Sequence, residues 1–236
     1  MPPLLLLALA LAVILHLQCV YSTVSEIEIS ALYDFWNSTQ GFAWHWRPPQ
    51  AVVINGQVWN FTVPLNSSEP CLSGDDSWQG VNCSASGDHI THIFLPAFGV
   101  TGTLPNSICD LSALQFLSLN ANQLHGTIPS CVSRMTALTT LTLTNNSFTG
   151  EIPSALWELT QLRVLSLFNN HLTGTLPPAV GDLPSLLMLS LAFNLLSGSL
   201  PAEMGKLGNV VYAPIGALCV IRYILCVSVW CSIEAP

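Results

Sequence analysis

The chain has 236 residues, of which half are hydrophobic and only 8% are charged, and its formal net charge is −8. These values exclude a nucleic-acid partner, because contacts to phosphates need clustered lysine and arginine and the whole chain has only five such residues. The apolar fraction is high for a soluble domain, and the two ends of the chain account for the excess.

Residues 1–22 predict a secretory signal peptide. Leu4 to Leu17 form an apolar run broken only by His16, and the sequence Val20-Tyr21-Ser22 suits cleavage after Ser22. The run is shorter than the ~20 residues that a membrane-spanning helix needs. We therefore expect the chain to enter the secretory pathway and to reach the extracellular space or the plasma-membrane surface.

Residues 23–89 are expected to cap the core that follows. Four apolar side chains recur at helical spacing there: Ile29, Leu32, Tyr33 and Trp36. Ser25 and Glu28 match a capping box at the start of the same helix.

N-glycosylation sequons agree with an oxidising, secretory compartment. They place candidate glycans on Asn37, Asn60, Asn66, Asn82 and Asn145. Four of these asparagines cluster before residue 90, which indicates an exposed, glycan-shielded cap.

From Ile90 the chain repeats with a fixed period of 24 residues. The copies open at Ile90, Leu114, Leu138, Leu162 and Leu186. Their shared pattern, L-x-x-L-x-L-x-x-N-x-L-x-G-x-[IL]-P, is typical of a solenoid of leucine-rich repeats. We expect five rungs over residues 90–209, forming an α/β solenoid whose positions four and six contribute to a parallel concave sheet.

Position nine of the repeat is polar although it lies where the coil turns inward. It holds Asn122, Asn146, Asn170 and Asn194. We expect a structural ladder in which each side-chain amide bonds the turn backbone of its own rung and the next, where an unpaired buried group would cost about 1–3 kcal/mol. Phe98 takes this position in rung one, so the first coil must satisfy its turn in another way.

The Gly-x-[IL]-Pro segment makes the array similar to the plant-type, 24-residue leucine-rich repeats of receptor-kinase ectodomains and polygalacturonase-inhibiting proteins. Kinetoplastid surface antigens carry similar repeats. Pro70-Cys71 followed by Trp78-x-Gly80-Val81-x-Cys83 resembles the paired-cysteine signature of the cap that precedes such repeats. The resemblance implies a disulfide between Cys71 and Cys83, worth about 3 kcal/mol by chain entropy.

Side chains beside the strand leucines face outward on the concave surface of this fold. We interpret nine of them as a candidate binding face: His92, Phe94, Phe116, Asn120, Thr142, Thr144, Arg163, Phe168 and Phe193. Aromatic anchors among polar groups suit a protein or peptide ligand. The other interpretation is that exposed Phe and Thr reflect only the preferences of a β-sheet surface. A glycan on Asn145 would obstruct the centre of this face.

No catalytic, metal or cofactor pattern is complete in the sequence. His89 and His92 would point to opposite faces of a strand, and no nucleophile elbow or phosphate-binding loop is present. We expect a protein that is not an enzyme and has no cofactor. Cys109 and Cys131 lie on the convex side of consecutive rungs, and their pairing is left open because their repeat positions differ by two.

Residues 210–236 break the pattern. A sixth rung should begin at Val210, but Leu218 replaces the ladder asparagine and no turn glycine or proline follows. Residues 213–233 are apolar and long enough for membrane association as a span of about 20 residues, although Arg222 near the centre opposes insertion. A membrane anchor, a lipid-anchor signal and a degenerate sixth rung all stay open.

The leading hypothesis is a secreted or cell-surface glycoprotein that recognises a protein or peptide through its concave face. The alternative is a structural coat or matrix glycoprotein without a defined ligand.

Overall fold

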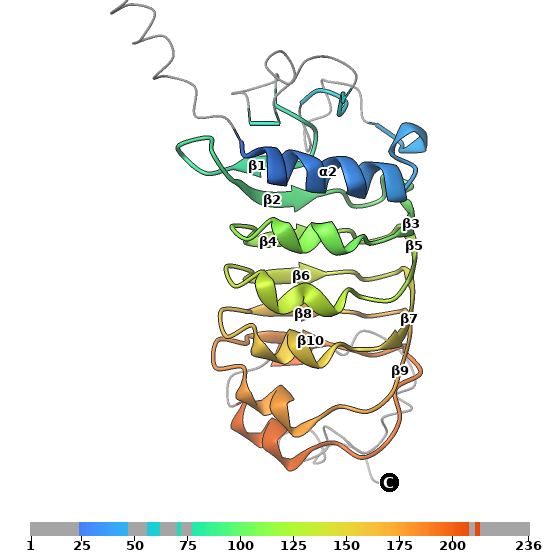
Figure 1. The fold of residues 1–236 in the computed structure, drawn as a ribbon. Coiled ribbons are helices and arrows are strands. Elements are labelled where there is room, and N and C mark those ends of the chain that lie inside the picture. The colour runs from blue at the N-terminus through green and yellow to red at the C-terminus, as the bar shows by residue number, and fades with distance from the viewer. Residues whose placement is uncertain (1–23, 47–55, 62–69, 72–76, 208–210, 213–236) are drawn as a thin grey trace, which may run out of the picture.

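The computed structural model describes residues 24–46, 56–61, 70–71, 77–207 and 211–212 (Figure 1). An α-helix lies across one end of a stack of rungs, and each rung follows the previous one in chain order. The predicted signal segment 1–22, the sequon at Asn66 and the apolar tail 213–233 lie outside the described residues.

The concave face of the stack is a parallel sheet with one strand from each rung. Its strands are β2 (Ile90–Phe94), β4 (Phe116–Ser118), β6 (Thr140–Thr142), β8 (Val164–Ser166) and β10 (Met188–Ser190). Within the described residues, β1 (Val81–Cys83) adds an antiparallel strand at one edge and β11 (Val211–Tyr212) a parallel strand at the other. Leu117 pairs with Leu141 and Leu141 with Leu165, so a step of one repeat moves the chain one strand sideways. The predicted solenoid with a parallel concave sheet is confirmed.

A second parallel sheet, which the sequence analysis did not predict, runs beside the first. It contains β3 (Thr101–Thr103), β5 (Gln123–Gly126), β7 (Ser147–Glu151) and β9 (His171–Thr173). The repeat glycine lies in or beside these strands with a positive φ, +78° at Gly126. A Cβ atom there would lie 3.0 Å from the Cγ2 atom of Thr103 in the preceding rung, so both the backbone conformation and the close approach require glycine.

The convex side is built from short 3₁₀ turns, each preceded by the repeat proline. They span Asn106–Asp110, Ser130–Arg134, Ser154–Glu158, Pro178–Asp182 and Ala202–Lys206. Leucines of the concave strands and apolar residues of these turns meet in one continuous core, in which Leu141 and Leu156 are at most 2% exposed. Burial of this apolar surface is the main favourable term for the fold.

Helix α2 (Glu26–Ser38) covers rung one and lies against the turn Asn106–Asp110. Ser25 caps the helix by accepting a hydrogen bond from the Glu28 amide. The predicted apolar face is partly wrong, because Tyr33 is 44% exposed whereas Phe35 is fully buried. A short 3₁₀ turn, Gly41–Ala43, follows the helix.

No helix among the described residues is both long enough and apolar enough to cross a bilayer.

Candidate functional site

The asparagine ladder fixes the backbone beneath the concave face. The Oδ1 atom of Asn146 accepts a hydrogen bond from the Leu124 amide at 3.0 Å, and its Nδ2 atom donates to the carbonyls of Leu119 and Leu143 at 2.9 and 3.0 Å. Leu119 and Leu124 belong to the preceding rung, so the expectation that the bonds reach the next rung is wrong in direction. Asn122, Asn170 and Asn194 repeat the same pattern.

This direction explains how rung one tolerates Phe98. The amide of Val100 and the carbonyl of Leu95 are both bonded by the side chain of Asn122 in rung two. Phe98 is fully buried, and its carbonyl accepts a hydrogen bond from the His45 amide of the cap at 2.6 Å. The cap and the second rung together therefore complete the first coil.

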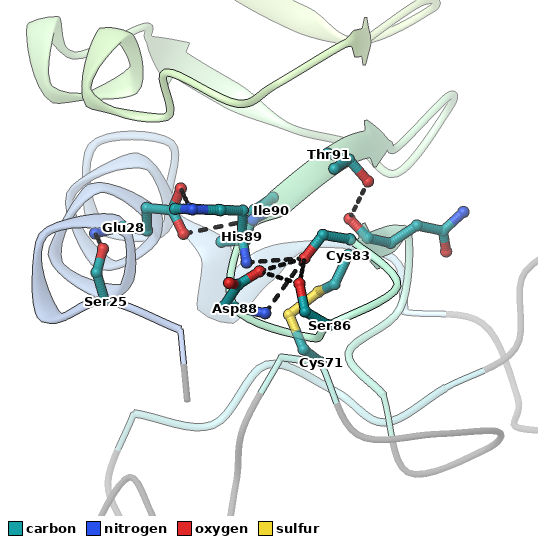
Figure 2. Close-up of polar contacts among 11 residues, drawn as sticks. Ser25, Glu28, Cys71, Cys83, Ser86, Asp88, His89, Ile90 and Thr91 are labelled. Carbon is teal, nitrogen blue, oxygen red and sulfur yellow. Dashed lines mark hydrogen bonds and ion pairs between the residues drawn. A yellow bond between two sulfur atoms is a disulfide. The ribbon is translucent and has the colours of Figure 1, made fainter. Parts of the chain in front are cut away.

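Polar contacts join the cap to the start of β2 (Figure 2). The buried carboxylate of Glu28 accepts a hydrogen bond from the Ile90 amide at 3.4 Å and lies 3.3 Å from Nδ1 of His89. Glu28 therefore does not close the predicted capping box back onto Ser25. In the adjoining loop, hydrogen bonds from the Ser84 and Ser86 hydroxyls lower the pKa of the Asp88 carboxyl.

Two disulfides brace this end of the molecule. Cys71 and Cys83, which the cap resemblance pairs, are bonded with their Cα atoms 5.6 Å apart. Cys109 and Cys131, whose pairing the sequence left open, are also bonded, with Cα atoms 6.0 Å apart. The difference of two repeat positions is bridged because both residues lie in adjacent 3₁₀ turns on the convex side.

One aromatic cluster lies at the cap-proximal end of the concave face. The rings of His92 and Phe94 lie 5.7 and 6.1 Å from the ring of Phe116, and all three side chains are half-buried. Burial lowers the pKa of the His92 imidazole, because a charged ring is poorly solvated there. The cluster therefore presents neutral aromatic surface. We call it the proximal cluster.

A second aromatic pair, the distal pair, lies two and three rungs further along. The rings of Phe168 and Phe193 meet edge to face at 5.0 Å, and Phe193 is 47% exposed. Phe193 also has a φ of +57°. A bulky residue in this left-handed conformation is an outlier that costs about 1–2 kcal/mol.

Hydroxyl and amide side chains separate the two aromatic groups. Thr144 bonds the hydroxyl of Ser166 at 2.7 Å, and Nδ2 of Asn169 donates to Oδ1 of Asn145 at 3.0 Å. Oδ1 of Asn120 accepts a hydrogen bond from the Thr144 amide at 3.0 Å. We call this region the polar strip. Thr142 lies within it on β6, and its hydroxyl is buried without a partner among the described residues.

The concave face carries no carboxylate among the described residues. The acidic residues of the described rungs lie elsewhere: Asp110, Glu151, Glu158, Asp182 and Glu203. Arg134 and Lys206 are paired with Asp110 and Asp182 on the convex side. Arg163, exposed directly before β8, has no acidic partner in the part of the chain that the structure describes. On a chain with a net charge of −8, this face is therefore locally neutral to basic.

The side chains of Asn37, Asn60, Asn82 and Asn145 are all exposed. Asn37 lies in α2 and Asn82 in β1, whereas Asn145 lies on the concave face between the two aromatic groups. The described residues hold no group of three or more potential metal ligands.

Comparison with known proteins agrees with the geometry. The family model "Leucine rich repeat" matches residues 112–172. The array is a leucine-rich repeat solenoid. Among curated proteins, an inactive receptor-like protein kinase of Arabidopsis thaliana is 34% identical over 112 residues, or 47% of this chain. The chain spans 15% of the length of that relative.

Solved leucine-rich repeat structures resemble a larger part of the chain. The ectodomain of the receptor kinase SOBIR1 from Arabidopsis thaliana is 26% identical with a TM-score of 0.62, and the match covers 81% of this chain and 92% of that one. The plant peptide hormone receptor RGFR1 in complex with RGF2 is 32% identical with a TM-score of 0.53, covering 57% of this chain and 24% of that one. The resemblance to extracellular repeat regions of plant receptor kinases is thus confirmed.

The nine residues of the predicted binding face all lie on the concave side, but they have different surroundings there. Eight of them belong to the proximal cluster, the distal pair or the polar strip between these two, and Arg163 lies directly before β8. Ser118 and Ser190, at a repeat position expected to face outward, are buried at 1% and 7% exposure. Sequence reasoning missed the separation into two aromatic groups, and the different repeat positions of the phenylalanines were the signal for it.

Proposed function

We propose that this leucine-rich repeat protein is a non-enzymatic recognition module that binds a protein or peptide segment on its concave face. The observation that carries the proposal is the pairing of accessible aromatic rings with a locked backbone. Phe116 lies on β4 and Phe168 lies two residues after the end of β8, and the buried ladder holds the turn that follows each strand, so the positions of both rings are set before a ligand arrives. Preorganised aromatic groups are typical anchors of binding interfaces.

The related structures support this assignment. RGFR1 is a peptide hormone receptor with a bound partner, and it shares the solenoid with this chain. The absence of carboxylates from the described concave face also supports a ligand that is neutral or acidic, because like charges across an interface are unfavourable.

The proposal includes a surface or extracellular location. Residues 1–22 would direct secretion, Asn37, Asn60, Asn66, Asn82 and Asn145 would carry glycans, and residues 213–233 would determine whether the chain is anchored. Expression of the full chain in secreting eukaryotic cells tests this. A mobility shift after N-glycosidase treatment is expected. Recovery of the chain only in the cytosol, without that shift, would overturn the location.

Binding is tested with a phage-displayed library of random linear peptides, selected on the full-length protein. Peptides enriched on the wild type should bind the Phe116→Ala and Phe168→Ala variants at least about tenfold more weakly, a loss common for truncated anchor residues. Phe42→Ala is the matched control, because Phe42 is 74% exposed but lies in the cap. Selection of no saturable binder would instead favour the structural coat or matrix role.

A further inference from the structure

Phe193 occupies a position of the repeat where its residue type is unfavourable. The same position holds Ala97, Ala121, Asn145 and Asn169 in the other rungs, and all five residues have φ between +55° and +57°. Asparagine tolerates this left-handed conformation better than other residues with a side chain, whereas a large aromatic residue does not.

Two separate costs therefore fall on Phe193. Its backbone is strained, and the residue is 47% exposed on the concave face instead of entering the core. The edge-to-face contact with Phe168 at 5.0 Å fixes the direction in which the ring points. Strain that the surrounding fold maintains is most often found where a group serves binding or catalysis. Phe193 thus marks the distal pair as a place where a ligand is held.

The proximal cluster supplies a second place for an apolar side chain. Phe116 lies on β4 with His92 and Phe94 against it, at the starting end of the strands. Phe168 lies two rungs away and four residues further along its own rung. With adjacent strands about 4.8 Å apart and residues about 3.3 Å apart along a strand, the diagonal between Phe116 and Phe168 is roughly 16 Å.

An extended ligand covers this diagonal with about five residues at about 3.3 Å each. Successive side chains of an extended chain point to opposite sides, so two anchors that face the same surface must be separated by an even number of residues. Because the ligand lies inside the curve of the sheet, its path is shorter than the path along the sheet. Anchors four residues apart fit better than anchors six apart.

The polar strip and Arg163 determine the chemistry expected of the ligand residues that separate the two anchors. Side chains of Asn120 and Thr144 can exchange hydrogen bonds with a ligand backbone. Arg163 lies beside this diagonal, directly before β8, and is the one ionic group on the described concave face. An acidic residue in the ligand spacer would complement Arg163, whereas a basic one would meet a like charge.

Resting on the proposed function, we propose that the concave face recognises an extended linear peptide with two apolar anchor residues at i and i+4 and a neutral or acidic spacer. The anchor at one end packs on Phe116 and its cluster, and the anchor at the other end packs on Phe168 and Phe193. The bound peptide lies diagonally across the concave face, from the start of the strands near the cap to the ends of the strands in rungs four and five.

A glycan on Asn145 would stand in this path, so the test uses full-length protein carrying Ser147→Ala. This change removes the sequon and leaves the bond between Asn145 and Asn169 in place. The probes are synthetic fluorescent peptides with two leucines separated by Ser-Asp-Ser, with the spacer lengthened or shortened by one residue, and with lysine replacing the aspartate. The expected result is that the i, i+4 peptide binds at least about tenfold more tightly than the others.

Two matched variants separate strain from recognition. Phe193→Asn places in rung five the residue that rungs three and four already use, so it should raise the melting temperature while weakening the i, i+4 peptide at least about tenfold. Ala121→Asn makes the same backbone improvement in rung two and should raise the melting temperature with binding unchanged.

The outcomes distinguish this inference from the proposed function. Peptides that need Phe116 and Phe168 but bind equally at every spacing would overturn the two-anchor inference and leave concave-face recognition standing. Unchanged binding of the i, i+4 peptide by Phe193→Asn would overturn the role of the distal pair. Enrichment of no library peptide and no binding of any synthetic probe would overturn both proposals.

Discussion

Replacing Asn122 or Asn146 with alanine should destabilise the solenoid by different amounts, although the two side chains have the same place in the repeat. They are similarly buried, at 9% and 7% exposure. In the Asn146→Ala variant the Leu124 amide loses its partner. The carbonyls of Leu119 and Leu143 each keep a hydrogen bond from the neighbouring ladder asparagine. One orphaned buried N–H group costs about 1–3 kcal/mol.

The Asn122→Ala variant leaves more buried backbone groups without a partner than Asn146→Ala does. The Val100 amide loses its partner, and so does the carbonyl of Leu95, because rung one has Phe98 where a ladder asparagine would supply a second bond. Two orphaned groups correspond to about 2–6 kcal/mol. The volume deleted is the same in both variants, so the comparison isolates the second group. Asn122→Ala should therefore cost about twice as much as Asn146→Ala.

Urea unfolding of the full-length variants, followed by circular dichroism, measures this difference. Gln123→Ala serves as the control, because Gln123 is exposed on β5 and its loss should change the free energy of unfolding by no more than about 0.5 kcal/mol. Equal losses for Asn122→Ala and Asn146→Ala would show that the ladder does not work through the preceding rung, and the account of rung one would fail.

Three further predictions concern the cap and the rungs next to it. Replacing Cys109 and Cys131 together with serine should lower the free energy of unfolding by about 3 kcal/mol through the closed loop, and an unchanged urea midpoint would contradict this. Glu28→Ala should cost about 1–3 kcal/mol by leaving the Ile90 amide buried and unpaired, and a change within experimental error would refute it. The pKa of His92 is lowered in the folded state, so its contribution to stability should fall as pH drops below the unfolded value of about 6.5 and be constant above it. An NMR titration that places this pKa at or above its ordinary value would contradict that sign.

The period of the sequence was sufficient to predict the concave sheet and its register. Identical positions such as Leu117 and Leu141 pair because each rung contains the same number of residues. The second sheet was missed because its strands are short and contain or directly precede the repeat glycine, and glycine usually weakens a strand. Stacking of identical rungs overrides that local preference at Gly126, where the missing side chain lets Thr103 pack closely.

The sequence was sufficient to predict which residues lie on the concave surface, but not how their side chains are arranged on it. Alternation along each repeat identifies Phe116 and Phe168 as outward-facing, but it gives neither their contacts nor the strain at Phe193. The cap helix shows the same limit. The apolar spacing of the helix predicted that Tyr33 would be buried, whereas Phe35 is buried instead. The helix takes this orientation because it must also place the Glu28 carboxylate against β2.

The direction of the ladder makes the two ends of the array unequal. Each ladder asparagine bonds the turn amide of the preceding rung, so the Leu196 amide of rung five would need a following asparagine, where the sequence has Leu218. No side chain among the described residues bonds the Leu196 amide, and Leu195 beside it is 61% exposed. Rung one, in contrast, is closed by the cap. In a solenoid, stability is approximately a sum of rung and interface terms, so rung five is the least protected part of the described array. A ligand that contacts Phe116 and Phe193 together would link this rung to the capped end, and its binding energy would then stabilise the whole concave face.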